Sequence, residues 1–186
     1  KPLADTVAAG RQILETARSA GTRFFSASSL RFVSELEQAC DRIAKPERAS
    51  MFGPLGKAPA GSSIVWYGVH AFEMLERAMG PGAKSVRVLG DSGGVVAIVG
   101  YGTQRRGVVE LTQGAYVYGG SLRAARQGVA FSVDMDQAYS GLLRRIEAFF
   151  QGGEIPVAHR ETLEISAMLE AADRSLATGG EEPVRI

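Results

Sequence analysis

Hydrophobic positions recur every three or four residues in several stretches of the chain, which is the spacing of one face of a helix. The clearest stretch predicts a helix from about Ser63 to Met79, and Gly80 followed by Pro81 ends it. The apolar positions of this helix are Val65, Val69, Phe72, Leu75 and Met79.

Four further helices are predicted from the same spacing and from residues typical of helix ends. They run from Asp5 to Gly21, from a capping box at Ser34–Glu37 to a stop before Pro46, from Asp134 with Gln137 three residues later to Gly152–Gly153, and around Arg160–Thr178. In the last two we expect buried stripes made of Tyr139, Leu142, Leu143, Ile146, Phe149 and Phe150, and of Ile165, Met168, Leu169, Ala172 and Leu176.

Between residues 84 and 133 the hydrophobic period changes to two, which predicts strands. Short connections between them require antiparallel neighbours, so we expect a meander. We also expect a buried strand at Arg23–Ser28, a long loop over residues 46–62 with one short strand around Ala49–Phe52, and a strand-like end at Pro183–Ile186. The meander strands are expected at Ser85–Leu89, Val95–Tyr101, Val108–Gln113, Ala115–Tyr118, Leu122–Arg126 and Ala130–Val133.

These elements define an α/β (α+β) fold: a mostly antiparallel open sheet with helices on one face. The length of 186 residues and the 45% apolar content suit one globular domain, or one domain with an appendage. No internal repeat is visible. Because an open sheet leaves one face uncovered, we predict self-association through the strands from Ser85 to Val133.

Charge and cysteine content exclude several classes of protein. The 21 basic and 20 acidic residues nearly cancel, so neither nucleic acid nor an anionic membrane is an expected partner. The longest apolar run, Val95–Val99, is too short to span a bilayer. A lone Cys40 makes no internal disulfide and starts no zinc site, which fits a reducing compartment such as the cytoplasm, and no metal is expected. Lys1 stands without a signal peptide, so we expect the chain to begin inside a longer one.

The glycine-rich segment Gly90-Asp91-Ser92-Gly93-Gly94 fits two catalytic patterns only superficially. A dinucleotide fingerprint and a nucleophile elbow both need a helix after the glycines, whereas here another strand follows. We therefore interpret it as a hairpin turn. In the same way Arg105 and Arg106 are interpreted as a solvated turn rather than an anion site, and Cys40 as a small packing residue.

Two histidines remain as candidates for proton transfer. His159 lies near the start of the last predicted helix, where a structural role is the simpler interpretation. His70 lies at the edge of the apolar face of the helix after Ser63, beside Trp66, Tyr67 and Glu73. An imidazole in such surroundings can exchange protons near neutral pH, although a hydrogen-bonded structural histidine fits the same position.

The order of three motifs resembles the second half of the Gfo/Idh/MocA oxidoreductases, which include glucose-fructose oxidoreductase and inositol dehydrogenase. The motifs are Lys1-Pro2-Leu3-Ala4 before a helix, Ser28-Ser29-Leu30-Arg31-Phe32 after a predicted strand, and Tyr67-Gly68-Val69-His70 within a helix. The tail is similar as well, with Gly152–Val157 before the final helix and Gly179–Ile186 after it. The resemblance covers almost the whole chain.

The resemblance implies an NAD(P)-dependent enzyme that oxidises a sugar or polyol hydroxyl. Lys1 and Pro2 match the end of a Glu-Lys-Pro motif beside the nicotinamide, and His70 matches the family's acid/base. Arg31 matches a basic residue often found after the strand, and Trp66 and Tyr67 are further candidates for substrate binding. The resemblance also implies that residues 1–44 are the last part of a Rossmann-type nucleotide-binding domain, that residues 45–186 are the sheet domain, and that the protein is a homo-oligomer.

Two departures from the family pattern bear on activity. The glycine fingerprint for NAD or NADP is absent, so we expect no useful cofactor binding and no activity by this fragment alone. Members of the family commonly carry Asp one helical turn before the histidine, where this sequence has Trp66. An indole can donate a hydrogen bond but cannot accept one from the ring, so Glu73 or Tyr67 would have to substitute. The alternative prediction is a non-catalytic relative that serves as a ligand-binding or oligomerisation module.

Overall fold

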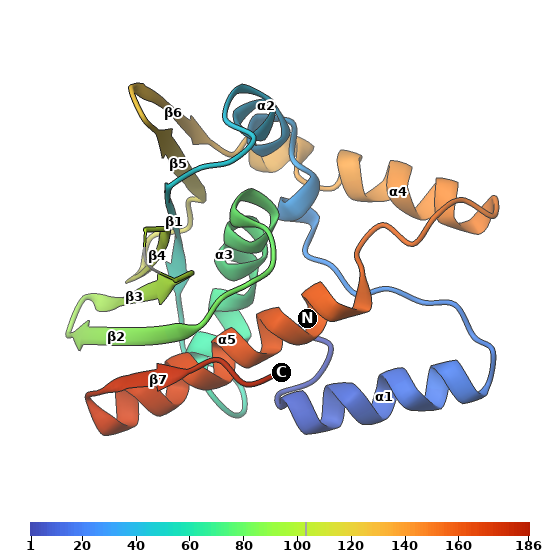
Figure 1. Ribbon diagram of the computed structural model, residues 1–186, viewed down its shortest axis with the longest axis horizontal. Helices are drawn as coiled ribbons and strands as arrows, with labels where there is room; N and C mark the ends of the chain where they lie inside the picture. The colour runs from blue at the N-terminus through green and yellow to red at the C-terminus, as the bar shows by residue number, and fades with distance from the viewer. Residues whose placement is uncertain (103) are drawn as a thin grey trace.

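A computed structural model describes residues 1–102 and 104–186, and within them an open sheet carries helices on one face (Figure 1). The helices are α1 (Val7–Ser19), α2 (Ser34–Arg42), α3 (Ser63–Met79), α4 (Ser140–Phe150) and α5 (His159–Thr178), with short 3₁₀ turns η1 (Ser29–Phe32) and η2 (Met135–Gln137). The strands are β1 (Arg48–Leu55), β2 (Ser85–Asp91), β3 (Gly94–Gly100), β4 (Arg106–Gln113), β5 (Gly119–Ala124), β6 (Gln127–Ser132) and β7 (Glu181–Pro183).

The sheet order within the described chain is β6-β5-β1-β4-β3-β2-β7. β1 runs parallel to β4, and every other neighbouring pair is antiparallel. The predicted fold class is therefore confirmed, as is the hairpin at Gly90–Gly94, where Asp91 and Gly94 are partners at the turn between β2 and β3. The expectation of an uninterrupted meander was wrong, because β1 lies between β4 and β5.

Strand β1 lies within residues 46–62, which were expected to form a long loop with one short strand. The sequence indicated only a short strand at Ala49–Phe52, because Pro54 cannot donate to a ladder and Gly53 and Gly56 weaken a strand. Pro54 is tolerated because β5 pairs with β1 only from Arg48 to Phe52, so on that side Pro54 has no ladder bond to supply. The short strand expected at Ala49–Phe52 is thus confirmed, and the structure extends it to Arg48–Leu55 and places it inside the sheet.

Helix α3 lies against the sheet and fixes the position of the residues discussed below. The Ser62 hydroxyl accepts hydrogen bonds from the backbone N–H groups of Ile64 and Val65, and Gly80, at φ 70°, ends the helix as predicted. Gly68 lets the helix approach closely, since a β-carbon there would lie 2.8 Å from the Leu111 side chain. Together α3 and α5 cover the sheet with fully buried side chains, including Phe72, Met74, Leu75, Met168 and Leu169.

Several local expectations were wrong at the level of individual elements. Residues 23–28 form no strand: they are irregular, and the Ser28 N–H bonds the Glu73 carboxylate. Residues 115–118 are irregular too, and the last two strands of the meander are shifted to β5 and β6. The capping box at Ser34 does not form, because Val33 is the N-cap of α2 and the Ser34 hydroxyl bonds Glu35.

The outer part of the fold is less buried than the apolar pattern indicated. Along α4, Leu143 is 60% and Phe150 81% exposed, and Tyr139 before it is 65% exposed. Leu176 in α5 is also exposed, and the C-terminal strand lies at Glu181–Pro183 rather than from Pro183 onward. Figure 1 shows α1 and α4 projecting on the side away from the sheet. Ile13 of α1 is 40% exposed, whereas Val7 of α1 and Leu142 of α4 pack against other parts of the chain.

Candidate active site

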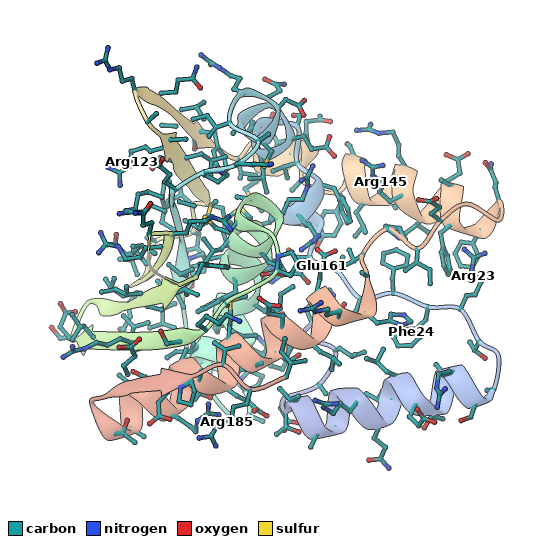
Figure 2. The ribbon with its side chains drawn as sticks, in the orientation of Figure 1. Arg23, Phe24, Arg123, Arg145, Glu161 and Arg185 are labelled. Atoms are coloured by element: carbon teal, nitrogen blue, oxygen red, sulfur yellow. The ribbon has the colours of Figure 1, made fainter. Side chains whose placement is uncertain are left out.

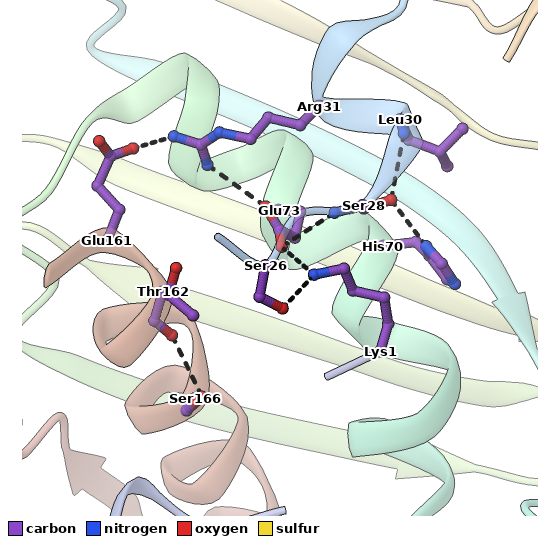
Figure 3. A network of polar contacts seen from close by, with 10 residues as sticks. All are labelled: Lys1, Ser26, Ser28, Leu30, Arg31, His70, Glu73, Glu161, Thr162 and Ser166. Carbon is purple, nitrogen blue, oxygen red and sulfur yellow. Dashed lines mark hydrogen bonds and ion pairs between the residues drawn. The ribbon is translucent and has the colours of Figure 1, made fainter. Parts of the chain in front are cut away.

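One side of α3 carries three of the side chains that the sequence indicated as candidates for catalysis or as their neighbours. Trp66, His70 and Glu73 follow one another at helical spacings of four and three residues, so they lie along one side of the helix. Figure 3 shows His70 and Glu73 of this side approaching Lys1 and the start of the turn η1. The chain thereby brings Lys1 and His70 into one polar network.

The imidazole of His70 is held by Ser28. The Ser28 Oγ lies 2.8 Å from His70 Nδ1 and also accepts a hydrogen bond of 3.2 Å from the Leu30 N–H. Because a hydroxyl can donate or accept, this contact suits both tautomers of a neutral imidazole. Burial is the main cause that lowers the pKa of His70 to about 4, and the positive charge of the Lys1 side chain acts in the same direction. The ring is therefore neutral at pH 7.

The carboxylate of Glu73 links the other groups of the network. One of its oxygens accepts a 3.1 Å hydrogen bond from the Ser28 N–H and lies 3.7 Å from the Lys1 ammonium. The other oxygen lies 3.5 Å from the Arg31 guanidinium. Burial raises the pKa of Glu73 and lowers those of Lys1 and Arg31, while the opposite charges of the three groups counteract these shifts. Glu73 thus holds Lys1 directly and holds His70 through Ser28.

Arg31 lies behind this network. Its side chain is 5% exposed and pairs with Glu161 as well as Glu73. A guanidinium engaged by two carboxylates fixes η1 and α5 against α3 (Figure 3). In this position the Arg31 guanidinium holds the Glu73 carboxylate in place.

A pocket of about 540 Å³ lies beside Lys1. Its volume falls in the range of roughly 300–1,000 Å³ typical of small-molecule sites. Trp66, which is 45% exposed, forms part of its wall, and Ser62 and Asp173 add polar atoms joined by a hydrogen bond of 2.5 Å. The described residues that line it do not include His70. The lining residues are Lys1, Pro2, Ala4, Asp5, Ala60, Gly61, Ser62, Val65, Trp66 and Asp173.

The aromatic residues near His70 divide into two groups. Trp66 lies at the pocket with Lys1 and Pro2. Tyr67 points elsewhere, and its hydroxyl lies 3.5 Å from the carbonyl oxygen of Lys57. The Tyr118 ring meets the His70 ring edge to face, with the ring centroids 6.0 Å apart. Burial raises the pKa of Tyr118 to about 12, so its phenol stays protonated at neutral pH.

The sequence pattern alone did not assign Ser28 or Glu73 a role. Both were visible as members or neighbours of quoted motifs, but the contact between them joins residues 45 positions apart. The partner of the histidine is a hydroxyl instead of the expected carboxylate, and it lies in a distant segment of the chain. No spacing within the helix could therefore have indicated it. Glu73 was considered as a partner for His70, whereas it contacts Lys1, Arg31 and the Ser28 backbone instead.

The other candidates have structural contacts. His159 donates through Nε2 to the carbonyl oxygen of Phe24 at 2.9 Å and stacks on the Phe24 ring. Cys40 is buried, and burial raises the pKa of its thiol. Within residues 1–102 and 104–186 no three His, Cys, Asp or Glu side chains gather in a way that could hold a metal ion. No helix in that part of the chain is long and apolar enough to cross a membrane.

The fold matches the C-terminal part of solved oxidoreductases of the Gfo/Idh/MocA type. No protein-family model matches the sequence, and a search of curated proteins gives no match. The likeness is one of structure, at identities that establish the fold alone.

Three solved structures illustrate the likeness. Scyllo-inositol dehydrogenase from Lactobacillus casei, with bound cofactor NAD(H) and scyllo-inositol, is 10% identical with a TM-score of 0.85, over 99% of this chain and 72% of its own. GenD2 from gentamicin A biosynthesis, in complex with NAD, is 13% identical with a TM-score of 0.83, over 100% of this chain and 70% of its own. The WlbA dehydrogenase from Bordetella pertussis, in complex with NADH and UDP-GlcNAcA, is 16% identical with a TM-score of 0.78, over 100% and 70%.

Proposed function

We propose that this chain is the substrate-handling part of an NAD(P)-dependent oxidoreductase that oxidises a hydroxyl of a sugar or polyol. The observation that carries the proposal is the single network in which Glu73 holds the Lys1 ammonium and, through Ser28, the His70 imidazole. Neighbours with the same fold bind NAD(H) together with scyllo-inositol, or NADH together with UDP-GlcNAcA, which supports the same chemistry here.

In this proposal His70 takes the proton of the reacting hydroxyl. With Nδ1–H donated to the Ser28 hydroxyl, Nε2 is left as the acceptor, and a pKa of about 4 keeps the ring unprotonated over the neutral range. The Lys1 ammonium polarises the same oxygen and stabilises the negative charge that develops on it. Glu73 and Ser28 set the positions of both groups.

The pocket beside Lys1 supports binding of the nicotinamide end of a cofactor. Its volume and its lining by an ammonium, a proline ring and an indole fit a flat ring and a small polyol. Lys1 and Pro2 would hold the cofactor, which supplies the hydride acceptor when bound. Trp66 offers a face to the C–H surface of a sugar, whereas Tyr67 and Arg31 lie farther from the pocket and would act through their neighbours.

The domain organisation and assembly belong to the same proposal. Residues 1–44 would complete a nucleotide-binding domain, and residues 45–186 would form the sheet domain.

The outer face of the sheet carries Phe52, Val96 and Leu89 in one row across β1, β3 and β2, with Glu110 of β4 among them. Such a row supports self-association through the strands from Ser85 to Val133 in a cytoplasmic protein. Sedimentation velocity should detect oligomers, and monomers at high protein concentration would contradict this part of the proposal.

The second candidate function is a non-catalytic ligand-binding or oligomerisation module. Trp66 stands where family members commonly carry a carboxylate, and a histidine with a pKa of about 4 is a weak base. Both observations favour a relative that kept the pocket and lost proton transfer.

The two functions are separated by one experiment on the protein that contains this chain. The coding region upstream of Lys1 is expected to encode Glu directly before it and a strand, G-x-G-x-x-G and helix farther upstream. Titration with NADH and NADPH then tests cofactor binding, and a panel of polyols and sugars tests formation of reduced nicotinamide. We expect turnover on at least one substrate. Cofactor binding without turnover on any of them would support the second candidate.

A further inference from the structure

Three arginines stand side by side on adjacent strands at one end of the sheet. Arg48 in β1 is the Cα partner of Arg106 in β4 and of Arg123 in β5. Their chain neighbours Ala49 and Leu122 are buried on the side of the helices. The alternation of side chains along a strand therefore places all three arginines on the open face, opposite α3. Figure 2 shows Arg123 at this outer side of the sheet.

A hollow of about 280 Å³ lies beside this row. The partner of Arg106 in β3 is Gly100, which has no side chain to fill the space. The hollow is lined by four arginines and, among the described residues, one carboxylate: Arg48, Arg87, Arg105, Arg106 and Glu181.

The guanidinium groups of two of these arginines are oriented by neutral partners. Arg48 donates to the backbone carbonyl oxygens of Glu47 and Gln104. Arg105 and Arg106 were expected in a solvated turn, but Arg106 begins β4 and Arg105 is half-buried and donates to the carbonyl oxygens of Pro46 and Met79. Carbonyl oxygens fix the direction of a guanidinium but leave its positive charge uncompensated.

Four other arginines of the described chain form ion pairs with carboxylates: Arg18 with Glu15, Arg31 with Glu73, Arg145 with Glu37 and Arg174 with Glu182. Residues 1–102 and 104–186 contain no ion pair that involves the arginines of the hollow. Like charges opposite each other on neighbouring strands are destabilising. Four positive charges therefore gather around one carboxylate, that of Glu181, which is the cross-strand neighbour of Arg87, although the whole chain carries a net charge of only +1.

We propose that the hollow binds the phosphate group of a small molecule, with Arg87 and Arg106 as its main contacts and Arg48 as a fixed wall. The planar fork of arginine matches the oxygens of a phosphate, and several forks around one space suit a multiply charged anion. The site lies across the sheet from His70, so it is separate from the proposed active site. It shares the open face of the sheet with the apolar row: Arg48 lies four residues from Phe52 along β1, and Arg87 lies two residues from Leu89 along β2.

The test is calorimetric titration of the protein with pyrophosphate, inorganic phosphate and a sugar monophosphate at low salt. We expect binding that weakens as sodium chloride is raised, since exposed charges are screened. The double variant R87Q/R106Q should bind at least about tenfold more weakly, the loss expected for a charged hydrogen bond. The matched control R11Q/R144Q removes two exposed helical arginines and should bind as the wild type does. Melting temperatures of the unliganded variants check that each one folds.

The outcomes decide the proposal without reference to the proposed enzyme activity. Equal affinity for phosphate and the sugar phosphate supports a site for the phosphate group itself, and tighter binding of the sugar phosphate supports a larger ligand. No binding by the wild type, or equal weakening in the control variant, overturns the proposal. The proposal is also overturned if the wild type binds no anion and R87Q/R106Q dissociates an oligomer. In that case the arginines pair with carboxylates of a second copy of the chain.

Discussion

Replacing His70 by alanine will lower kcat for polyol oxidation by about 10²- to 10⁴-fold, which is the contribution typical of a positioned general base. The variant removes the imidazole that the Ser28 hydroxyl holds. That imidazole belongs to the network in which Glu73 contacts both Ser28 and Lys1. Cofactor affinity should change little, because the pocket walls at Pro2 and Trp66 do not depend on the imidazole. Steady-state kinetics and cofactor titration measure the two effects separately.

The pH profile gives a second readout for this prediction. Wild-type activity should rise with pH as His70 loses its proton near pH 4, and this acidic limb should vanish in the alanine variant. His159→Ala is the matched control, since that histidine bonds the Phe24 carbonyl and stacks on the Phe24 ring. An H70A enzyme that keeps wild-type kcat would remove His70 from the mechanism.

Raising the pH from about 4.5 to 8 will destabilise the wild-type protein, and Glu76→Gln will remove much of this dependence. Glu76 is 1% exposed, and neither of its carboxylate oxygens has a hydrogen-bond partner among the described residues. Burial, and the nearby Glu164, raise its pKa from 4.5 to about 8. Each unit of such a shift corresponds to roughly 1.4 kcal/mol, so the loss of unfolding free energy reaches up to about 5 kcal/mol.

The sign follows from the protons bound in each state. Between pH 4.5 and 8 the unfolded chain loses the Glu76 proton while the folded chain keeps it, so the stability falls with pH and levels off above 8. Arg31 and Arg160 lower the pKa of Glu76, while Glu73 on the same helix raises it further. The backbone N–H groups of Gly82 and Ala83 both donate to the Glu164 carboxylate, so this second buried carboxylate has hydrogen-bond partners that Glu76 lacks among the described residues.

Urea unfolding of the wild type, E76Q and the exposed control E147Q at pH 5, 7 and 9 measures the effect. The curve for E76Q should be much flatter than that for the wild type, and the E147Q curve should follow the wild type. Parallel pH dependences in all three proteins would contradict a raised pKa at Glu76.

Sequence patterns predicted what depends on local order and missed what depends on contacts between distant segments. Helix α3 was predicted because its apolar spacing, its N-cap and Gly80 all agree. Strand β1 was read mainly as a loop, because its prolines and glycines argue against a strand and only its distant partners β4 and β5 explain it. The motif order brought out Lys1 and His70, but not the Ser28 and Glu73 contacts that join them.

The buried carboxylates show the same limit. Glu76 and Glu164 look like ordinary surface positions of two helices, and only the packing of α3 and α5 reveals that both are excluded from water. Likewise Arg48 and Arg106 carry no motif, since their juxtaposition arises from a register between strands far apart in the chain.

The placement of β1 between β4 and β5 has a consequence for how the molecule acquires its native state. A parallel pair formed by residues some sixty positions apart is a high-contact-order pairing, so its closure comes late in assembly. The segment that leaves β1 leads directly into the helix that bears His70. Because α3 packs on β4, we expect the imidazole to reach its place beside Ser28 only after the middle of the sheet has closed, which would tie proton transfer to completion of the whole fold.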